Sequence, residues 1–234
     1  MLPFGQQERK SMSNVIITIA RQYGSGGKTV GKMLAKELDI PYYDREIIAM
    51  AAEESGVNPT LFQDEFKHHG LRALLSGGYK GGRLLSPESA GFTSDDNLFN
   101  YQAKIIRSLA EEGSCVIIGR CADHILRDMP GVVRVFVHAP EDFCLQEAMK
   151  VNSLPENEVK KLITKTDDYR ARYYKYYTGQ EWKNALNYDL SLDSSRLGFD
   201  GTVEAIKAYI GVRKRFDKNF SSENNSGMSH EIKA

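Results

Sequence analysis

The sequence predicts an α/β fold in which a mostly parallel, five-stranded sheet is covered by helices on both faces. Five short apolar runs of strand type are separated by segments whose apolar residues recur at helical spacing. The first of these runs leads directly into a glycine-rich loop and a helix. Strands that alternate with helices in this way form parallel sheets with a helical layer on each side.

The glycine-rich loop follows the first predicted strand, at residues 15–20, and precedes a helix that reaches to about Leu38. Its residues are Gly24, Ser25, Gly26, Gly27, Lys28 and Thr29. Glycines let successive backbone N–H groups turn toward one anion, and the helix N-terminus adds partial positive charge. A lysine at this offset reaches the β- and γ-phosphates, and a neighbouring hydroxyl ligates Mg²⁺. We therefore predict a P-loop that binds ATP through these six residues, with Lys28 catalytic and Thr29 as the Mg²⁺ ligand.

One position departs from the full P-loop pattern, because Gln22 stands where the first glycine of G-x-x-x-x-G-K-[ST] is expected. A dinucleotide-binding G-x-G-x-x-G fits less well, since its third glycine would fall at Thr29. A plain glycine-rich turn between a strand and a helix is the remaining alternative. The Lys-Thr pair at the correct offset favours the phosphate-binding interpretation.

The remaining elements alternate along the chain. The predicted strands lie near 41–43 and at 115–118, 132–137 and 188–192. The predicted helices lie at 45–54, 59–66, 95–112, 122–127, 140–151, 153–177 and 202–212. We expect a core at 14–216, with a mobile N-terminus at 1–13 and a disordered polar tail at 217–234.

The least regular stretch, within 57–98, is rich in glycine and serine and carries Arg72, Lys80 and Arg83. A long loop in a compact domain is usually functional or disordered. These basic residues suit a clamp over an anionic substrate, and they equally suit a solvated surface.

Charged residues follow several predicted strands, where ligands of open α/β sheets gather. Asp44 and Arg45 come after the second strand, and Arg120 follows Gly119 after the third. Asp44 is also a good N-cap for the helix at 45–54, and Arg120 alternatively forms a surface salt bridge.

The predicted helix at 153–177 places Asp167, Arg170 and Tyr174 on one face. Arginines brought over a γ-phosphate neutralise charge during phosphoryl transfer. The helix is therefore either a closing lid with Arg170 at the site or an exposed helix with ordinary ion pairs.

The composition excludes several classes of protein. Lysine plus arginine and aspartate plus glutamate both number 31, so the net charge gives no sign of a nucleic-acid or anionic-membrane partner. No apolar run approaches the roughly 20 residues of a membrane span. Three cysteines without a C-x-x-C pair suggest free thiols and a cytoplasmic location.

Several segments together resemble the cytidylate-kinase-like family of P-loop proteins. They are ITIARQYGSGGKTVGKMLAKELDIPYYDREII, CVIIGRCADHIL, VVRVFVHAPED, KTDDYRARYYKYYTGQEW and NYDLSLDSS. The resemblance runs from about Val15 to Ile210. It implies a three-layer P-loop fold with a helical monophosphate-binding insert at 57–98 and a helical lid region at 141–187.

The resemblance also implies an activity, namely transfer of the ATP γ-phosphoryl group to a nucleoside monophosphate, CMP or dCMP, with Mg²⁺. Lys28, Arg120 and Arg170 would be catalytic. The acceptor would contact Asp44, Arg45, Arg120 and Asp123. The expected partner is thus a small nucleotide, and the oligomeric state stays open.

Two departures from the family pattern keep other functions open. Cys121 follows the Gly-Arg pair where cytidylate kinases carry aspartate, and Asp123 comes two residues later. The stretch EDFCLQEAMK lacks the arginines expected there. The alternatives are a P-loop kinase for another small acceptor and a non-enzymatic nucleotide-binding regulatory protein. A nucleophilic Cys121 is a weaker idea, because no histidine is predicted beside it.

Overall fold

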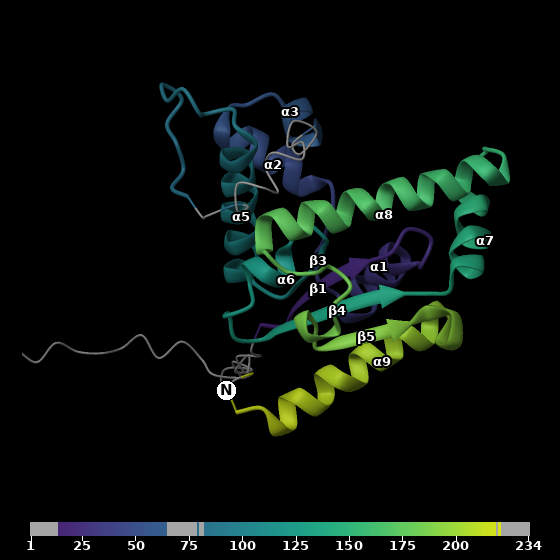
Figure 1. Cartoon of the computed structure of the whole chain (residues 1–234). Helices are drawn as coiled ribbons and strands as arrows, with labels where there is room; N and C mark the ends of the chain where they lie inside the picture. Colours follow the sequence, from purple (N-terminus) through teal and green to yellow (C-terminus); the bar gives the residue numbers. More distant parts are fainter. Residues whose placement is uncertain (1–13, 65–78, 80–81, 219, 221–234) are drawn as a thin grey trace, which may run out of the picture.

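The computed structural model describes residues 14–64, 79, 82–218 and 220 of the chain (Figure 1). Its sheet has five strands in the order β2-β3-β1-β4-β5, and every neighbouring pair is parallel. The strands are β1 Ile16–Arg21, β2 Tyr42–Tyr43, β3 Cys115–Ile118, β4 Val132–His138 and β5 Leu190–Asp193. The predicted α/β class and five-stranded sheet are confirmed.

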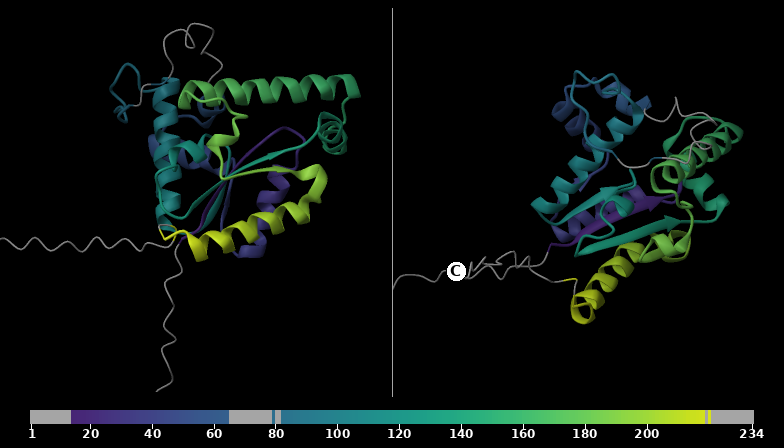
Figure 2. Two further views of the ribbon diagram at one scale, coloured as in Figure 1. Left: turned by 60° about the horizontal axis from the view of Figure 1, so that its bottom comes forward. Right: turned by 60° about the vertical axis from the view of Figure 1, so that its left-hand side comes forward.

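Helices cover both faces of this sheet, which gives three layers. One layer contains α1 Gly27–Leu38 and α9 Ser194–Phe216, and the other contains α2 Glu46–Ser55, α3 Pro59–Asp64, α5 Asp95–Glu112 and α6 Ala122–Ile125. Figure 2 shows α9 and the blue helices α2 and α3 on opposite sides of the strands. The alternation of side chains along β1 supplies both layers, because Ile17 and Ile19 pack with α1 and α9 while Ile16 packs with α2 and α5.

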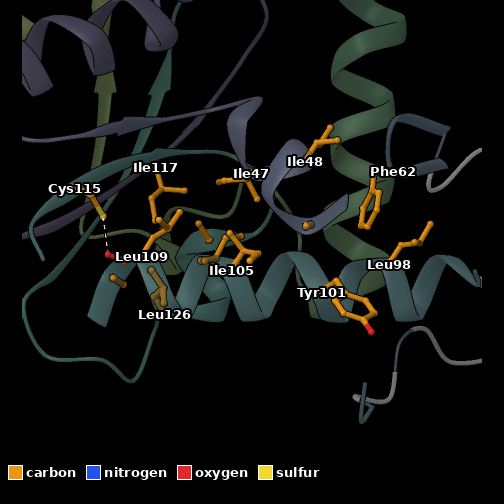
Figure 3. Packing of buried hydrophobic residues seen from close by; sticks show 14 of the residues in the cluster. Ile47, Ile48, Phe62, Leu98, Tyr101, Ile105, Leu109, Cys115, Ile117 and Leu126 are labelled. Carbon is orange, nitrogen blue, oxygen red and sulfur yellow. Dashed lines mark hydrogen bonds between the residues drawn. The ribbon is translucent and has the colours of Figure 1, made fainter. Parts of the chain in front are cut away.

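The layer of α2 and α5 forms a closely packed core (Figure 3). Ile47, Leu98, Ile106 and Ile117 are each at most 1% exposed there. Burying an aliphatic side chain of this size contributes about 1.5–3 kcal/mol relative to exposing it. This core fixes β3 against α2 and α5, and so fixes the loops that follow β2 and β3.

Two further helices, α7 Glu141–Val151 and α8 Glu156–Thr178, follow β4. In Figure 1, α8 spans from α7 to α5. The C-terminal part of α8 packs into an aromatic cluster, in which the rings of Tyr177 and Phe99 stack at 3.9 Å between centroids. The buried members of that cluster are Ala20, Phe99, Cys121, Phe136, Tyr173, Tyr174, Tyr176, Tyr177, Trp182 and Tyr188. Helix α8 is therefore anchored at this end, while its N-terminal half is mostly exposed.

The C-terminal elements differ from the sequence prediction. Helix α9 begins at Ser194 rather than near 202, because Asp193 accepts hydrogen bonds from the backbone and the hydroxyl of Ser195. The prediction found only the part beyond Gly198, whose backbone is not helical (φ 66°, ψ 176°). Within the predicted tail, Phe220 is 1% exposed and packs under the guanidinium of Arg213. Positions 221–234 and 1–13 lie outside the described residues.

None of the helices in the described part of the chain is long and apolar enough to cross a membrane.

Candidate active site

The candidate site lies where the carboxyl ends of the strands meet. Arg21 ends β1, Asp44 follows β2, and Gly119 and Arg120 follow β3. The central strand β1 lies between β3 and β4. The chain continues from β1 to β2 on one side of it, and later crosses from β3 to β4 on the other side, so the direction of the connections changes beside β1. Ligands of open α/β sheets bind at such switch points.

The P-loop glycines are required by the surrounding atoms. Gly24 and Gly26 have φ angles of 81° and 75°. A Cβ atom on Gly24 would lie 2.2 Å from the carbonyl oxygen of Cys144, and one on Gly26 would lie 2.1 Å from the ring of Phe199. Gly26 also caps α1 without a side-chain hydrogen bond, so no cap occupies the N–H groups of the first turn. The loop thus presents backbone donors to an anion.

Ser25 and Gln22 hold the shape of this loop. The Ser25 hydroxyl is fully buried and donates to the carbonyl oxygens of Gln22 and Val137 at 3.0 and 2.9 Å. The side-chain oxygen of Gln22 accepts a hydrogen bond from the backbone of Ala139 at 3.2 Å. Gln22, which departs from the P-loop pattern, therefore ties the loop to the end of β4. The side chain of Ser25 serves the same purpose, because its hydroxyl donates to carbonyl oxygens of the protein itself.

Lys28 and Thr29 are both exposed at the start of α1. The ammonium of Lys28 lies 2.6 Å from Oδ2 of Asp44, and the guanidinium of Arg21 lies 4.0 Å from Oδ1. The expectation that Asp44 caps α2 is wrong, because the N-cap is Arg45. The uncapped helix start, the glycine cradle and the exposed hydroxyl of Thr29 fit a triphosphate with Mg²⁺.

A cavity of about 600 Å³ lies between α2, α3 and α8. It brings together all the predicted acceptor residues, namely Asp44, Arg45, Arg120 and Asp123, and it also brings in Arg170. Its apolar wall consists of Ala20, Ile48, Ala49, Pro59, Phe62, Ile118, Tyr169, Tyr173 and Trp182. The lining therefore combines charged side chains with aromatic and aliphatic ones.

Arg170 connects α8 to the P-loop strand. Its Nη1 donates to the carbonyl oxygen of Arg21 and to Oδ1 of Asp167, both at 3.1 Å. The same Asp167 oxygen accepts a hydrogen bond from the backbone N–H of Tyr23 at 2.8 Å. Burial lowers the pKa of Arg170 from its ordinary value. The predicted face of α8, with Asp167, Arg170 and Tyr174, does point into the site.

Arg120, in the loop after β3, also lines the cavity. It is held in a left-handed backbone conformation with φ 55°. Its Nη1 donates to Oε1 of Gln102 at 2.6 Å, which aims the side chain from β3 across to α5. No described carboxylate lies within ion-pairing distance of Arg120, so the alternative of a surface salt bridge is wrong for the described residues.

Asp123 lies beside the cavity and is shielded from water. Its Oδ2 accepts a hydrogen bond from the Tyr174 hydroxyl at 2.6 Å. Burial raises the pKa of Asp123 to about 6, and Tyr174 partly opposes that rise. Cys121 is 3% exposed, which does not suit a nucleophile. Asp123 and Tyr174 thus form a hydrogen-bonded pair in the lining of the cavity.

Arg21 is the residue that the sequence prediction missed. Its guanidinium lines the same cavity as Arg120 and Arg170. Burial, and next the positive charge of Arg170, lower the pKa of Arg21 to about 9. Its place directly after the first strand, at the sheet edge, was the available signal. By contrast, Arg83 is exposed and does not line the cavity, while Arg72 and Lys80 lie outside the described residues.

Comparisons with known proteins found a matching family model, a curated relative and a similar solved structure. The family model described as "Cytidylate kinase-like family" matches residues 16–196. A cytidylate kinase of Methanopyrus kandleri is 25% identical over 206 residues, which cover 84% of this chain and 93% of that protein. The crystal structure of an uncharacterized protein from Eubacterium ventriosum is similar with a TM-score of 0.64 and 26% identity, over 86% of this chain and all of that one.

Proposed function

The chain belongs to the cytidylate kinase-like family, and from this premise we propose that it transfers the γ-phosphoryl group of ATP to a nucleoside monophosphate. The preferred acceptor in this proposal is CMP or dCMP, as the name of the Methanopyrus kandleri relative suggests. At the coarser level of its family the chain is a kinase-like phosphotransferase.

The observation that supports this proposal is the concentration of positive charge beside the P-loop. Arg21, Arg120 and Arg170 line one cavity, and Lys28 lies just beyond it on the far side of Asp44. Arginine is suited to phosphate because its guanidinium donates in a planar fork. A cavity with this charge favours an acceptor that is itself a phosphate over a neutral hydroxyl compound.

The aromatic residues of the cavity lining suit a planar base. Tyr169, Tyr173 and Trp182 present aromatic side chains there, and aromatic rings stack on flat π systems. The volume of about 600 Å³ falls in the ordinary range for small-molecule sites, roughly 300–1,000 Å³. Asp123 and Tyr174 add polar groups to the cavity lining.

The proposed reaction uses Lys28, the three arginines and the cavity in the following way. An oxygen of the acceptor phosphate attacks the γ-phosphorus of ATP in line. The bond between that phosphorus and the β,γ-bridging oxygen breaks, and ADP and the nucleoside diphosphate result. No general base is needed, because the acceptor phosphate is already ionised. Lys28 and the arginines neutralise the charge on the transferred group. The Thr29 hydroxyl would hold Mg²⁺, which would further neutralise the charge of the phosphates.

The test is a coupled assay of ADP production from Mg-ATP, screened over CMP, dCMP, UMP and AMP. We expect turnover that prefers CMP or dCMP and that is lost in Lys28→Ala. Turnover without any acceptor nucleotide, or equal turnover with all four, would contradict the proposed preference.

A second candidate is a P-loop kinase for another small acceptor. It is favoured by α7, since Glu141–Lys150 contains no arginine to hold a nucleotide phosphate. Under this alternative, ATP binds to the wild-type protein, but none of the four nucleotides increases ADP production. A non-enzymatic regulatory protein would in addition fail with every other acceptor supplied.

A further inference from the structure

The side chain of Arg21 occupies a passage that two glycines leave open. A Cβ atom on Gly27 would lie 2.5 Å from Cβ of Arg21, and one on Gly119 would lie 2.4 Å from its Nη1. Gly27 starts α1, and Gly119 belongs to the loop after β3. The first residue of α1 and the loop after β3 therefore both lack side chains where Arg21 runs, which indicates that packing fixes the position of this side chain.

The charge of Arg21 is incompletely balanced. The only carboxylate among the described residues within 4.0 Å of its guanidinium is Asp44, at that limit, and Asp44 is bound more closely by Lys28 at 2.6 Å. Arg120 and Arg170 add further positive charge around it. The side chain of Arg21 is 19% exposed, and a largely buried charge without a close counter-ion is costly. This arrangement therefore favours the binding of an anion beside Arg21, Arg120 and Arg170.

Arg21 lies between the P-loop and the cavity. Its backbone begins the turn into the P-loop, where its carbonyl oxygen accepts from Arg170. Its guanidinium lines the acceptor cavity. Lys28, on the P-loop side, shares the carboxylate of Asp44 with it. The transferred phosphoryl group must pass through this region if ATP occupies the P-loop and the acceptor occupies the cavity.

We propose that Arg21 is a catalytic residue that binds the phosphoryl group during its transfer and bridges the γ-phosphate to the acceptor phosphate. This inference rests on the proposed function. It also accounts for the missing arginines of α7, because the charge that α7 lacks is supplied from the end of β1.

The experiment compares Arg21→Met, which keeps the length of the stem but removes the charge, with Arg172→Met on the exposed face of α8. In the coupled assay, we expect kcat of Arg21→Met to fall by about 10²–10³. The KM for ATP should change by much less, because the P-loop is intact. Arg172→Met should keep the wild-type kcat. A kcat for Arg21→Met within about threefold of the wild-type value would overturn the proposal.

Chemical rescue separates catalysis from structure. In Arg21→Ala, the passage beside Gly27 and Gly119 becomes empty, and added guanidinium ion should restore part of the lost kcat at concentrations that do not unfold the protein. Arg21→Met should show no rescue, because its stem fills the passage. Equal responses of the two variants would argue for a structural role and against the proposal.

A binding measurement tests Arg21 even if no nucleotide acceptor is found. Inorganic pyrophosphate, titrated by calorimetry, should bind Arg21→Met at least about tenfold more weakly than Arg172→Met, as expected when a charge-assisted hydrogen bond is lost. Equal affinities would overturn the role of Arg21. Absence of transfer to all nucleotides with this affinity difference intact would instead count against the proposed function alone.

Discussion

The two halves of the candidate site are built in different ways. The P-loop is a continuous segment of six residues, and its shape comes from backbone groups and from glycines that admit no Cβ atom. The adjacent cavity is assembled from side chains on β1, α2, α3, α8 and the loops after β2 and β3, which lie far apart in the sequence. The P-loop is therefore sensitive to added atoms, whereas the cavity is sensitive to changes of charge.

The largest expected effect is at Lys28, which joins the two halves through Asp44. Lys28→Ala should reduce kcat by about 10²–10³, as when one preorganised stabilising group is removed. The matched control is Lys36→Ala in the last turn of the same helix, where the side chain is exposed. Comparable losses in both variants would show that the effect comes from α1 itself and not from the P-loop.

Added volume in the P-loop should destabilise the protein. Gly26→Ala places a methyl group 2.1 Å from the Phe199 ring at a φ angle of 75°, and we expect a loss of about 2–5 kcal/mol in the free energy of unfolding. Gly211→Ala is the control, since no atom lies within 4 Å of its Cβ position on α9, and alanine there should stabilise the helix by about 1 kcal/mol. Urea titrations measure both, and a shift of the same sign in both would contradict the account.

Ionisation of Asp123 in the cavity lining should make the stability of the protein depend on pH. The pKa of Asp123 is raised to about 6 in the folded protein, so the folded state holds a proton that the unfolded chain has lost between about pH 4 and pH 6. The free energy of unfolding of the wild-type protein should therefore fall with rising pH, relative to Asp123→Asn, by about 3 kcal/mol over that range. Asp128→Asn, whose side chain is 87% exposed, is the control. A pH-independent difference would refute this assignment.

A smaller effect is expected where α8 meets the P-loop. Asp167→Asn removes the negative charge that holds Arg170 but keeps an oxygen for the backbone N–H of Tyr23. We expect a loss of about 1.5–3 kcal/mol in stability, typical of a hydrogen bond to a charged group, with an increased KM for the acceptor. Thermal unfolding and the coupled assay measure these effects. Asp168→Asn, one residue away and exposed, should change neither.

The same contrast explains how much the sequence could predict. The P-loop was predicted completely in position, because strand, glycines, Lys28 and Thr29 are contiguous. Asp44, Arg120 and Arg170 were predicted because each follows a strand or shares a helical face. Arg21 also directly follows the first predicted strand, but it was missed, because its place beside Arg120 and Arg170 depends on packing between segments that are distant in sequence. The burial of Asp123 against Tyr174 depends on packing between α6 and α8, which no pattern within either segment shows.

The starting point of α9 illustrates the same limit. Its first turn depends on capping by Asp193 and on a non-helical Gly198 within the segment, so apolar spacing found only the later part. The role of Gln22 likewise depends on Ala139, which is distant in sequence.

The most direct test of the account asks whether the two halves serve two different substrates. Arg120 and Arg170 both line the cavity, and the side chain of Arg120 is held by a hydrogen bond to Gln102. Arg120→Met should raise the KM for CMP or dCMP by at least about tenfold, while the KM for ATP stays within about threefold of the wild-type value. An equal rise in both KM values, or no CMP-dependent transfer by the wild-type protein, would contradict a site divided into a P-loop for ATP and a cavity for the nucleoside monophosphate.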